Sequence, residues 1–371
     1  MRSNTKNNFQ KYILFIFFVL LFIQSGQAQS LDSLFSKLDF SGSVSFSQNY
    51  NDNILDYSPR DIDSLNSGVT QKTSDKYSIS EPSDYITTIK AKGGIIAHWF
   101  KKNPTIFNIR LSHNFYGNSH IKNNTSWGIE FKQTVKRKNY VTVGLSGVPN
   151  NYLRNLKFRR PKKSIDQRYI EVFLNKRGYS FEVGREIVSN TIVDMQYNYF
   201  STDYTTEFDE RNNHSNEIVL EGRTKLSREI EISGAYLYDV TKANGSTAIP
   251  DSVRVSGVTK LKYRDDVSST VHRGKIGIDF SFKQRFQLPL KWSTDFIYEK
   301  QEYNTTQSLN KYYGRKDSYV KIATEFSFRF EKNYELSLQY YWEENTNSQN
   351  ISNDFGSYQT HQIGCSFEYH F

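Results

Sequence analysis

The stretch "RLSHNFYGNSHIKNNTSW" (110–127) contains the residues of this chain whose types and spacing come nearest to a catalytic arrangement. Its histidine, His113, is able to activate a hydroxyl nucleophile, provided that the hydroxyl lies within hydrogen-bond reach. Position 115 lies on the same side of an extended strand as His113, and it is Phe115, while Ser119 falls in the loop beyond. We therefore expect no acyl hydrolase, and no enzyme.

Metal and cofactor chemistry has no support either. The seven histidines form no metal-ligand spacing, and the single cysteine, Cys365, excludes an internal disulfide framework. No glycine-rich phosphate loop follows an expected strand. The formal net charge of +9 is concentrated in short stretches such as "KKNP", "KRKN" and "KLSR". We expect no cofactor and no nucleic-acid partner.

Charged residues recur at alternate positions of stretches whose other positions are apolar. Alternate side chains of a strand share one face, so these charges are expected together on the polar face. The candidates for this face are Lys90, Lys92, Arg110, Lys132, Glu182, Glu217, Glu221, Glu231, Arg273, Lys275, Asp295, Glu325 and Arg329. The early strands are mainly basic, the middle strands mainly acidic, and the late strands mixed. Two interpretations stay open: a basic wall facing an acidic wall across water, or a salt-bridge network that fills a closed interior.

The first 28 residues have the pattern of a cleaved signal peptide. Arg2, Lys6 and Lys11 precede the apolar run 12–23, which is short for a membrane helix, and small residues follow it in "SGQA". The mature chain then begins near Gln29 outside the cytoplasm. Residues 29–39 are expected to be a short periplasmic segment.

Composition narrows the fold class. The hydrophobic content is only 37%, yet aromatic residues reach 15%, with 26 Tyr and 27 Phe. Many aromatics, few aliphatics and alternating stretches are typical of a transmembrane β-barrel, whose strands face lipid on one side and water on the other. A secreted β-sandwich or β-helix is the main competitor.

The lengths of the links between strands favour the barrel. Tight turns at 101–104 and 136–139 alternate with long links such as 52–83 and 189–215. An up-and-down barrel in an outer membrane has this asymmetry, with short turns on the periplasmic side. The pattern predicts an all-β, antiparallel barrel over 40–371 with about fourteen strands, twelve to sixteen being compatible with it. In this assignment 150–166 is a loop, and "NKRG" (175–178) is a turn between two strands.

The chain ends on "IGCSFEYHF" (363–371), a strictly alternating strand. It resembles the last strand of bacterial outer-membrane proteins, which ends in an aromatic residue read by the barrel-assembly machinery. The resemblance implies a Gram-negative outer membrane and makes Phe367, Tyr369 and Phe371 the assembly signal. No more specific family is recognised.

The stretch 110–127 also resembles, in part, the region of outer-membrane phospholipases in which a serine stands two residues after a histidine on the outer surface of the barrel. Phe115 occupies that serine position here. We therefore interpret His113 as an interfacial histidine on the lipid face.

Two functions remain. The first is a porin-like channel for small polar or charged solutes. The second is a non-conducting accessory barrel of an envelope complex for secretion, uptake or surface assembly, because inward aromatics (Tyr116, Tyr169, Phe173 and Tyr341) would narrow the lumen. The expected partners are outer-membrane lipids, the assembly machinery, small polar solutes and an envelope protein.

Overall fold

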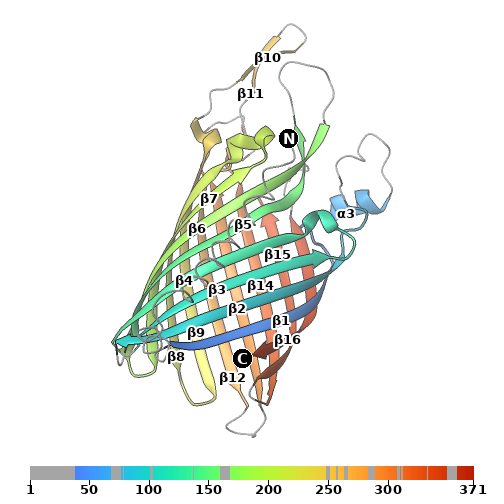
Figure 1. The fold of residues 1–371 in the computed structure, drawn as a ribbon. Helices are drawn as coiled ribbons and strands as arrows, with labels where there is room; N and C mark the ends of the chain where they lie inside the picture. The colour runs from blue at the N-terminus through green and yellow to red at the C-terminus, as the bar shows by residue number, and fades with distance from the viewer. Residues whose placement is uncertain are drawn as a thin grey trace, which may run out of the picture.

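The chain folds into a tall, closed β-barrel whose strands are strongly tilted relative to the barrel axis (Figure 1). The computed structural model describes residues 38–67, 77, 79–100, 103–136, 138–158, 168–247, 251–255, 258–262, 266–282, 289–306, 310, 312–331, 333–348 and 357–371. The expected signal peptide and most of the segment 29–39 lie outside these residues.

Fourteen antiparallel strands form the barrel, as the sequence predicts, and each pairs with its neighbours in chain order. They are β1 (Leu38–Asn51), β2 (Asp84–Phe100), β3 (Asn103–Tyr116), β4 (Asn124–Lys136), β5 (Asn139–Phe158), β6 (Arg168–Val188), β7 (Thr191–Tyr204), β8 (Asn213–Lys225), β9 (Ile230–Ala243), β12 (Ser269–Ser281), β13 (Leu290–Tyr303), β14 (Lys316–Phe330), β15 (Tyr334–Asn347) and β16 (Tyr358–His370). The last strand, β16, pairs with β1 and closes the ring.

Longer links gather at one end of the barrel, here called the long end, and shorter links at the other, the short end, although 282–289 at the short end is as long as 205–212. The links at the long end are 52–83, 117–123, 159–167, 205–212, 244–268, 304–315 and 348–357, and those at the short end are 101–102, 137–138, 189–190, 226–229, 282–289 and 331–333. The long end carries the helix α3 (Pro59–Asn66) and a separate hairpin of β10 (Asp251–Val255) and β11 (Val258–Lys262) (Figure 1). Among the described residues, no helix has the length and apolar character needed to cross a membrane.

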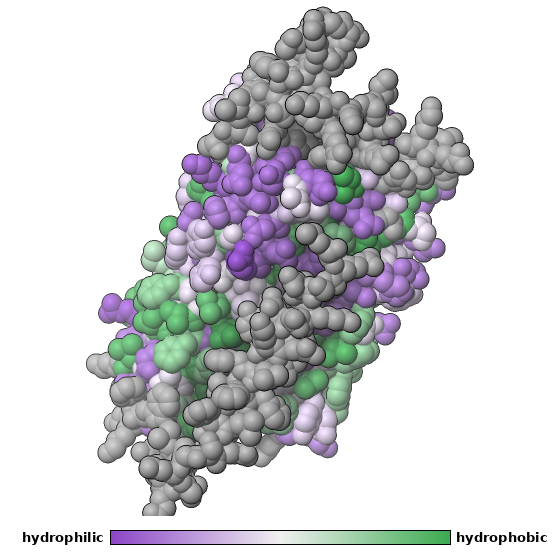
Figure 2. Space-filling model, turned by 45° about the horizontal axis from the view of Figure 1, so that its top comes forward, coloured by the Kyte–Doolittle hydropathy of each residue, from purple (hydrophilic) through white to green (hydrophobic). Residues whose placement is uncertain are grey.

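The outer face of the barrel is apolar. Cross-strand neighbours such as Phe46 and Ile89, or Phe131 and Val143, are large, hydrophobic and exposed. Figure 2 shows hydrophobic side chains gathered over the lower part of the visible wall and hydrophilic ones toward the opposite end. An exposed apolar surface of this extent is stable only in lipid, and a closed barrel leaves no sheet edge there. The protein is an outer-membrane β-barrel.

The predicted strand boundaries are wrong between residues 150 and 204. β6 runs without a break through "NKRG" (175–178), and β5 continues to Phe158, through the first half of the predicted loop. β7 occupies part of the predicted link 189–215. One strand was divided in two and another was missed, so the total of fourteen was reached through two errors that cancel.

The physical reason for these errors is that β5 and β6 continue past the lipid-facing band. Arg177 of β6 pairs with Asp203 of β7 at 2.6 Å, and Asn175 accepts a hydrogen bond from the backbone of Asn150. Polar residues on both faces suit a strand that stands in water, where lipid no longer imposes alternation. The polar interruption marks the edge of the membrane rather than a turn.

The closing seam is tightly fitted on both faces. Gly42 and Phe371 exchange two backbone hydrogen bonds of 3.0 Å, and the Phe371 ring lies where a side chain at position 42 would be. On the inner face, Asn49 fills the space above Gly364 and accepts a hydrogen bond from Gln339 at 2.5 Å. The small residues at positions 42 and 364 therefore make room for their partners across the seam.

The facing of the strands predicts a strong asymmetry between neighbouring positions of β14. Ile322 lies on the outer face and Ala323 on the inner face, opposite Asp295. Ile322→Arg is expected to destabilise the barrel by about 2–4 kcal/mol, because the charge enters the bilayer near its middle. Ala323→Arg is the matched control, with a small expected effect. Denaturant unfolding in lipid vesicles measures both, and equal losses would contradict the facing assignment.

Candidate functional site

All the predicted lumen residues lie on the face opposite the exposed apolar residues. The register places Lys92 beside Arg110, and Lys132 beside Thr142, which in turn lies beside Glu182. On the other side of the ring, Glu325 faces Ser293 and Gln339. Their position on the inner face follows from the strand register, whereas their contribution to a solute path remains a prediction.

Between β12 and β15 most of the inner charges are paired, Glu325 being an exception among the described residues. The ion pairs are Arg273–Glu299 at 2.5 Å, Lys275–Asp295 at 2.9 Å, Lys291–Asp279 at 3.0 Å, Arg329–Glu335 at 2.6 Å and Lys321–Glu343 at 3.3 Å. Each joins opposite charges on adjacent strands, so this part of the wall presents little net field. It matches the salt-bridge interpretation of the inner charges.

The inner face of β2–β4 is basic and weakly paired. Lys92 lies 3.5 Å from Glu368, and Arg110 lies 3.8 Å from Glu130, while both cationic side chains are more than half exposed. Lys132 lies over the Tyr140 ring at 3.4 Å. Lys90 is exposed and has no ion pair among the described residues. This part of the wall matches the other interpretation, a positive surface open to the lumen.

The inner face of β7–β9 is acidic. Glu217 and Asp239 are direct cross-strand neighbours, and their carboxylates are held by Asn198 and Thr241 through hydrogen bonds of 2.7 and 2.9 Å. Arg223 is shared between Asp194 at 2.7 Å and Glu221 at 3.4 Å. Further toward the short end, Glu231 lies 3.9 Å from Lys225, and Glu182 accepts from the Tyr140 hydroxyl. Paired and segregated charges thus coexist in one lumen.

A cavity of about 380 Å³ opens on the inner wall beside the basic residues. Lys90, Lys92 and Arg110 line it, as do Lys176 and Phe200. The sequence pattern does not predict Lys176 and Phe200, because it places Lys176 in the turn 175–178 and Phe200 in the link 189–215. The signal for them is alternation along the strand, Lys176 with Tyr179 on β6 and Phe200 with Tyr197 and Tyr199 on β7.

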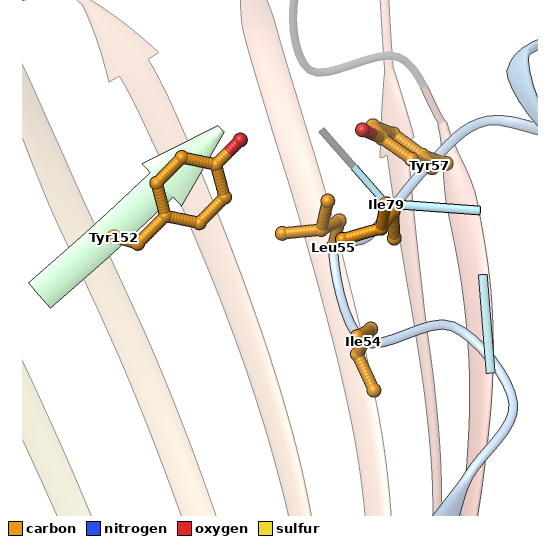
Figure 3. Packing of buried hydrophobic residues seen from close by; sticks show 5 residues of the cluster. All are labelled: Ile54, Leu55, Tyr57, Ile79 and Tyr152. Carbon is orange, nitrogen blue, oxygen red and sulfur yellow. The ribbon is translucent and has the colours of Figure 1, made fainter. Parts of the chain in front are cut away.

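The link after β1 folds into the long end of the barrel. Leu55 lies opposite Tyr152 of β5, and Ile54, Tyr57 and Ile79 complete a buried cluster (Figure 3). Of the inward aromatics expected from the sequence, Tyr116 and Phe173 pack against this cluster. The other two, Tyr169 and Tyr341, are half-buried, and Lys321 lies over the Tyr341 ring at 3.8 Å.

Polar contacts hold this link from both sides. Asn53 donates to the backbone carbonyl oxygen of Gln359 on β16 at 3.2 Å. Arg154 of β5 donates to the carbonyl oxygen of Leu55, and Lys122, in the turn η2 (His120–Lys122), donates to that of Ile54. The link therefore lies inside the long end of the barrel and narrows the lumen. A second cavity, of about 360 Å³, adjoins it and shares Ser126 and Val148 with the first.

Asp56, in this link, is half-buried. Burial raises the pKa of its carboxyl to about 6, although the nearby cations Lys122, Arg154 and Lys321 lower it and Glu343 raises it further. Burial likewise lowers the pKa of the Lys122 ammonium to about 8. Lys321 lies on β14 and Arg154 on β5, and these two strands are opposite each other in the ring. Charges on opposite sides of the barrel therefore both lower the pKa of Asp56.

His113 lies on the outer face, and its Nδ1 is 2.7 Å from the hydroxyl of Thr125 on β4. The same type of pair recurs around the long end, where His214, His272 and His361 contact the hydroxyls of tyrosines on neighbouring strands at 2.7–3.0 Å. A contact repeated on four pairs of strands forms part of an aromatic girdle at the membrane surface. This arrangement agrees with the interpretation of His113 as an interfacial residue.

Neither a protein-family model nor a curated protein sequence matches this chain. Solved structures match it along most of its length. An anion-selective porin from Comamonas acidovorans is 8% identical, with 90% of this chain and 99% of that chain covered and a TM-score of 0.42. OmpT, an outer-membrane protein of Vibrio cholerae, is 8% identical over 90% and 97% of the two chains, with a TM-score of 0.44. OccAB3 of Acinetobacter baumannii is 11% identical over 90% and 100%, with a TM-score of 0.42.

The raised pKa of Asp56 predicts a pH-dependent packing of the link 52–57. A buried acid with a raised pKa stabilises the packed state below its unfolded pKa, and this stabilisation is lost as the pH rises through about 6. Amide hydrogen exchange in 52–57, corrected for its intrinsic pH dependence, should therefore be slower at pH 5 than at pH 7. Asp56→Asn should abolish the difference. The exposed Asp63→Asn on α3 is the control, and loss of the pH effect there as well would contradict the assignment.

Proposed function

We propose that the protein is an outer-membrane channel for small polar solutes that prefers anions. The observation that supports this most is the division of charge on the inner face. The cations of β2–β4 are exposed and weakly paired, whereas those between β12 and β15 form short ion pairs. A low-dielectric wall strengthens the field of unscreened charges, so a solute in this lumen passes a positive surface.

In this proposal the long end of the barrel faces the cell exterior, since longer loops lie outside in barrels of this kind. The inward link 52–57 then forms the constriction nearest to the medium. Because Arg154 and Lys122 hold its backbone through a few hydrogen bonds, it is able to change between a seated and a released state.

A non-conducting accessory barrel is the second candidate, and two observations favour it. The late strands carry several ion pairs, and the buried cluster around Leu55 occupies part of the lumen. Such an interior would suit a scaffold whose outer surface or long links bind an envelope protein. Conductance separates the two functions.

We also propose the biogenesis that the sequence suggests. A signal peptide over 1–28 directs export, and Phe367, Tyr369 and Phe371 are the signal read by the barrel-assembly machinery. Support comes from the outward position of Phe367 and Tyr369 on the strand that closes the ring, and from the exposure of Phe371 directly after it.

Charge substitutions on the inner wall test the ion preference in planar bilayers. Changing Lys90, Lys92 and Arg110 together to Gln should shift the reversal potential in a salt gradient toward cation preference. Changing Glu217, Glu221 and Glu231 to Gln should shift it the other way. Both shifts should be larger at 0.1 M than at 1 M salt, because the Debye length falls from about 10 Å to about 3 Å.

Lys300→Gln is the matched control for these substitutions, because Lys300 lies on the outer face beside Glu302. Its removal should leave the reversal potential unchanged. A wild-type barrel that passes no current would overturn the channel and leave the accessory function as the better account.

Release of the link 52–57 should open the channel. Arg154→Ala removes hydrogen bonds from a charged donor, each of which contributes about 1.5–3 kcal/mol. Since 1.4 kcal/mol corresponds to a tenfold change in an equilibrium, we expect the conducting fraction to rise by about tenfold or to saturate. Arg177→Ala is the control, because Arg177 lies on the neighbouring strand β6 and pairs with Asp203 of β7 rather than with the link. An unchanged conductance in Arg154→Ala would show that this link is no constriction.

A further inference from the structure

The cavity of about 380 Å³ has a floor without large side chains. The strand register places Arg110, Gly128, Ser146, Gly178 and Phe200 in one row across β3–β7. A row runs across the strands, with successive strands about 4.8 Å apart. The three residues in the middle of this row are glycine or serine, so they leave a hollow between a guanidinium at one end and an aromatic ring at the other.

A second row lies on the side of the long end. It contains Lys90, Ser112 and Ser126, and farther along Val148 and Lys176. Like the first row, it begins with a cation and continues with small residues. The hollow is therefore two rows wide, and small residues together with Val148 separate the basic residues at one end from Phe200 at the other.

The charged end of the hollow is suited to an anionic group. The Arg110 guanidinium lies over Gly128, because a Cβ at position 128 would meet its Nε and Nη2 atoms at 3.6 Å. Lys90 and Lys92 line the cavity beside it. Arg110 and Lys92 have only long contacts to Glu130 and Glu368, and Lys90 has no ion pair within the described part of the chain. Cations with spare donors bind a carboxylate or a phosphate strongly.

The opposite end of the hollow is suited to an uncharged ring. The Phe200 ring edge and the Ser146 hydroxyl converge over Gly178, at 2.8 and 2.6 Å from where its Cβ would be. Lys176 lies over Phe200 at 4.1 Å and holds the ring in place. Only glycine at position 178 permits the Phe200 ring to come this close to the backbone. The Phe200 ring therefore lies close against the barrel wall, and the lumen side of the ring is open to the cavity.

We propose that this hollow is a binding site for a small organic anion, with its carboxylate or phosphate held by Lys90 and Arg110 and its ring packed against Phe200. The role of this site rests on the proposed channel function, because a solute crossing the lumen would bind here on its way. Binding itself requires no conduction. The volume is at the lower end of the range for ligand pockets, which favours a single ring.

Calorimetric titration of the full mature chain in detergent micelles tests the site. Phenyl phosphate supplies both ring and charge, inorganic phosphate supplies the charge alone, and phenol supplies the ring alone. We expect phenyl phosphate to bind more tightly than either. Lys90→Gln and Arg110→Gln should each weaken it about tenfold, as expected for the loss of one charge-assisted hydrogen bond.

Two further variants separate the parts of the site. Phe200→Ala should weaken phenyl phosphate and leave inorganic phosphate unchanged. Lys291→Gln removes a lysine of the same inner face that is paired with Asp279, far around the ring, and should change neither affinity. Heat-modifiable migration on a gel confirms that each variant is folded before it is titrated.

The results discriminate between the site and the channel. Equal affinity for inorganic phosphate and phenyl phosphate, or an equal loss in Lys291→Gln, overturns the site. A barrel that conducts but does not bind phenyl phosphate overturns the site and leaves the channel. A barrel that binds with the expected variant pattern but passes no current keeps the site and overturns the channel.

Discussion

The structure depends on one constraint, which is that a backbone in lipid must satisfy its hydrogen bonds within itself. Fourteen strands meet it only as a closed ring, and the pairing of β16 with β1 supplies the last set of bonds. Closure divides every strand into a lipid face and a lumen face. The fit of Phe371 over Gly42 and of Asn49 over Gly364 shows how closely the two ends of the ring are matched.

The constraint also explains which parts of the fold could be predicted from the sequence. Where strands cross lipid, apolar and polar residues must alternate, so the faces of Phe46, Lys92 and Ile322 follow from the pattern. Beyond the lipid no such rule holds. Polar residues such as Asn175 and Lys176 then resemble a turn although the strand continues, and the error in β5–β7 has this origin.

The lumen was less predictable than the strands. The alternation of residues along each strand assigns Lys90 and Glu217 to the inner wall. Only the register between strands shows which charged side chains are neighbours. The inward link was not predictable from periodicity, because Ile54 and Leu55 lie in a polar, aperiodic stretch and are buried in a cluster with Tyr152 that forms only in the folded barrel. The hollow beside Arg110 depends on two glycines two strands apart, a relation that exists only in the assembled sheet.

The link 52–57 has a mechanical consequence as well. It is bonded to β16 through Asn53 and to β5 through Arg154, and it packs against Tyr152. A thin cylinder deforms most easily by flattening, and a brace between two separated parts of its wall resists that deformation. The same segment that narrows the passage would keep the mouth of the barrel round under the lateral pressure of a crowded membrane.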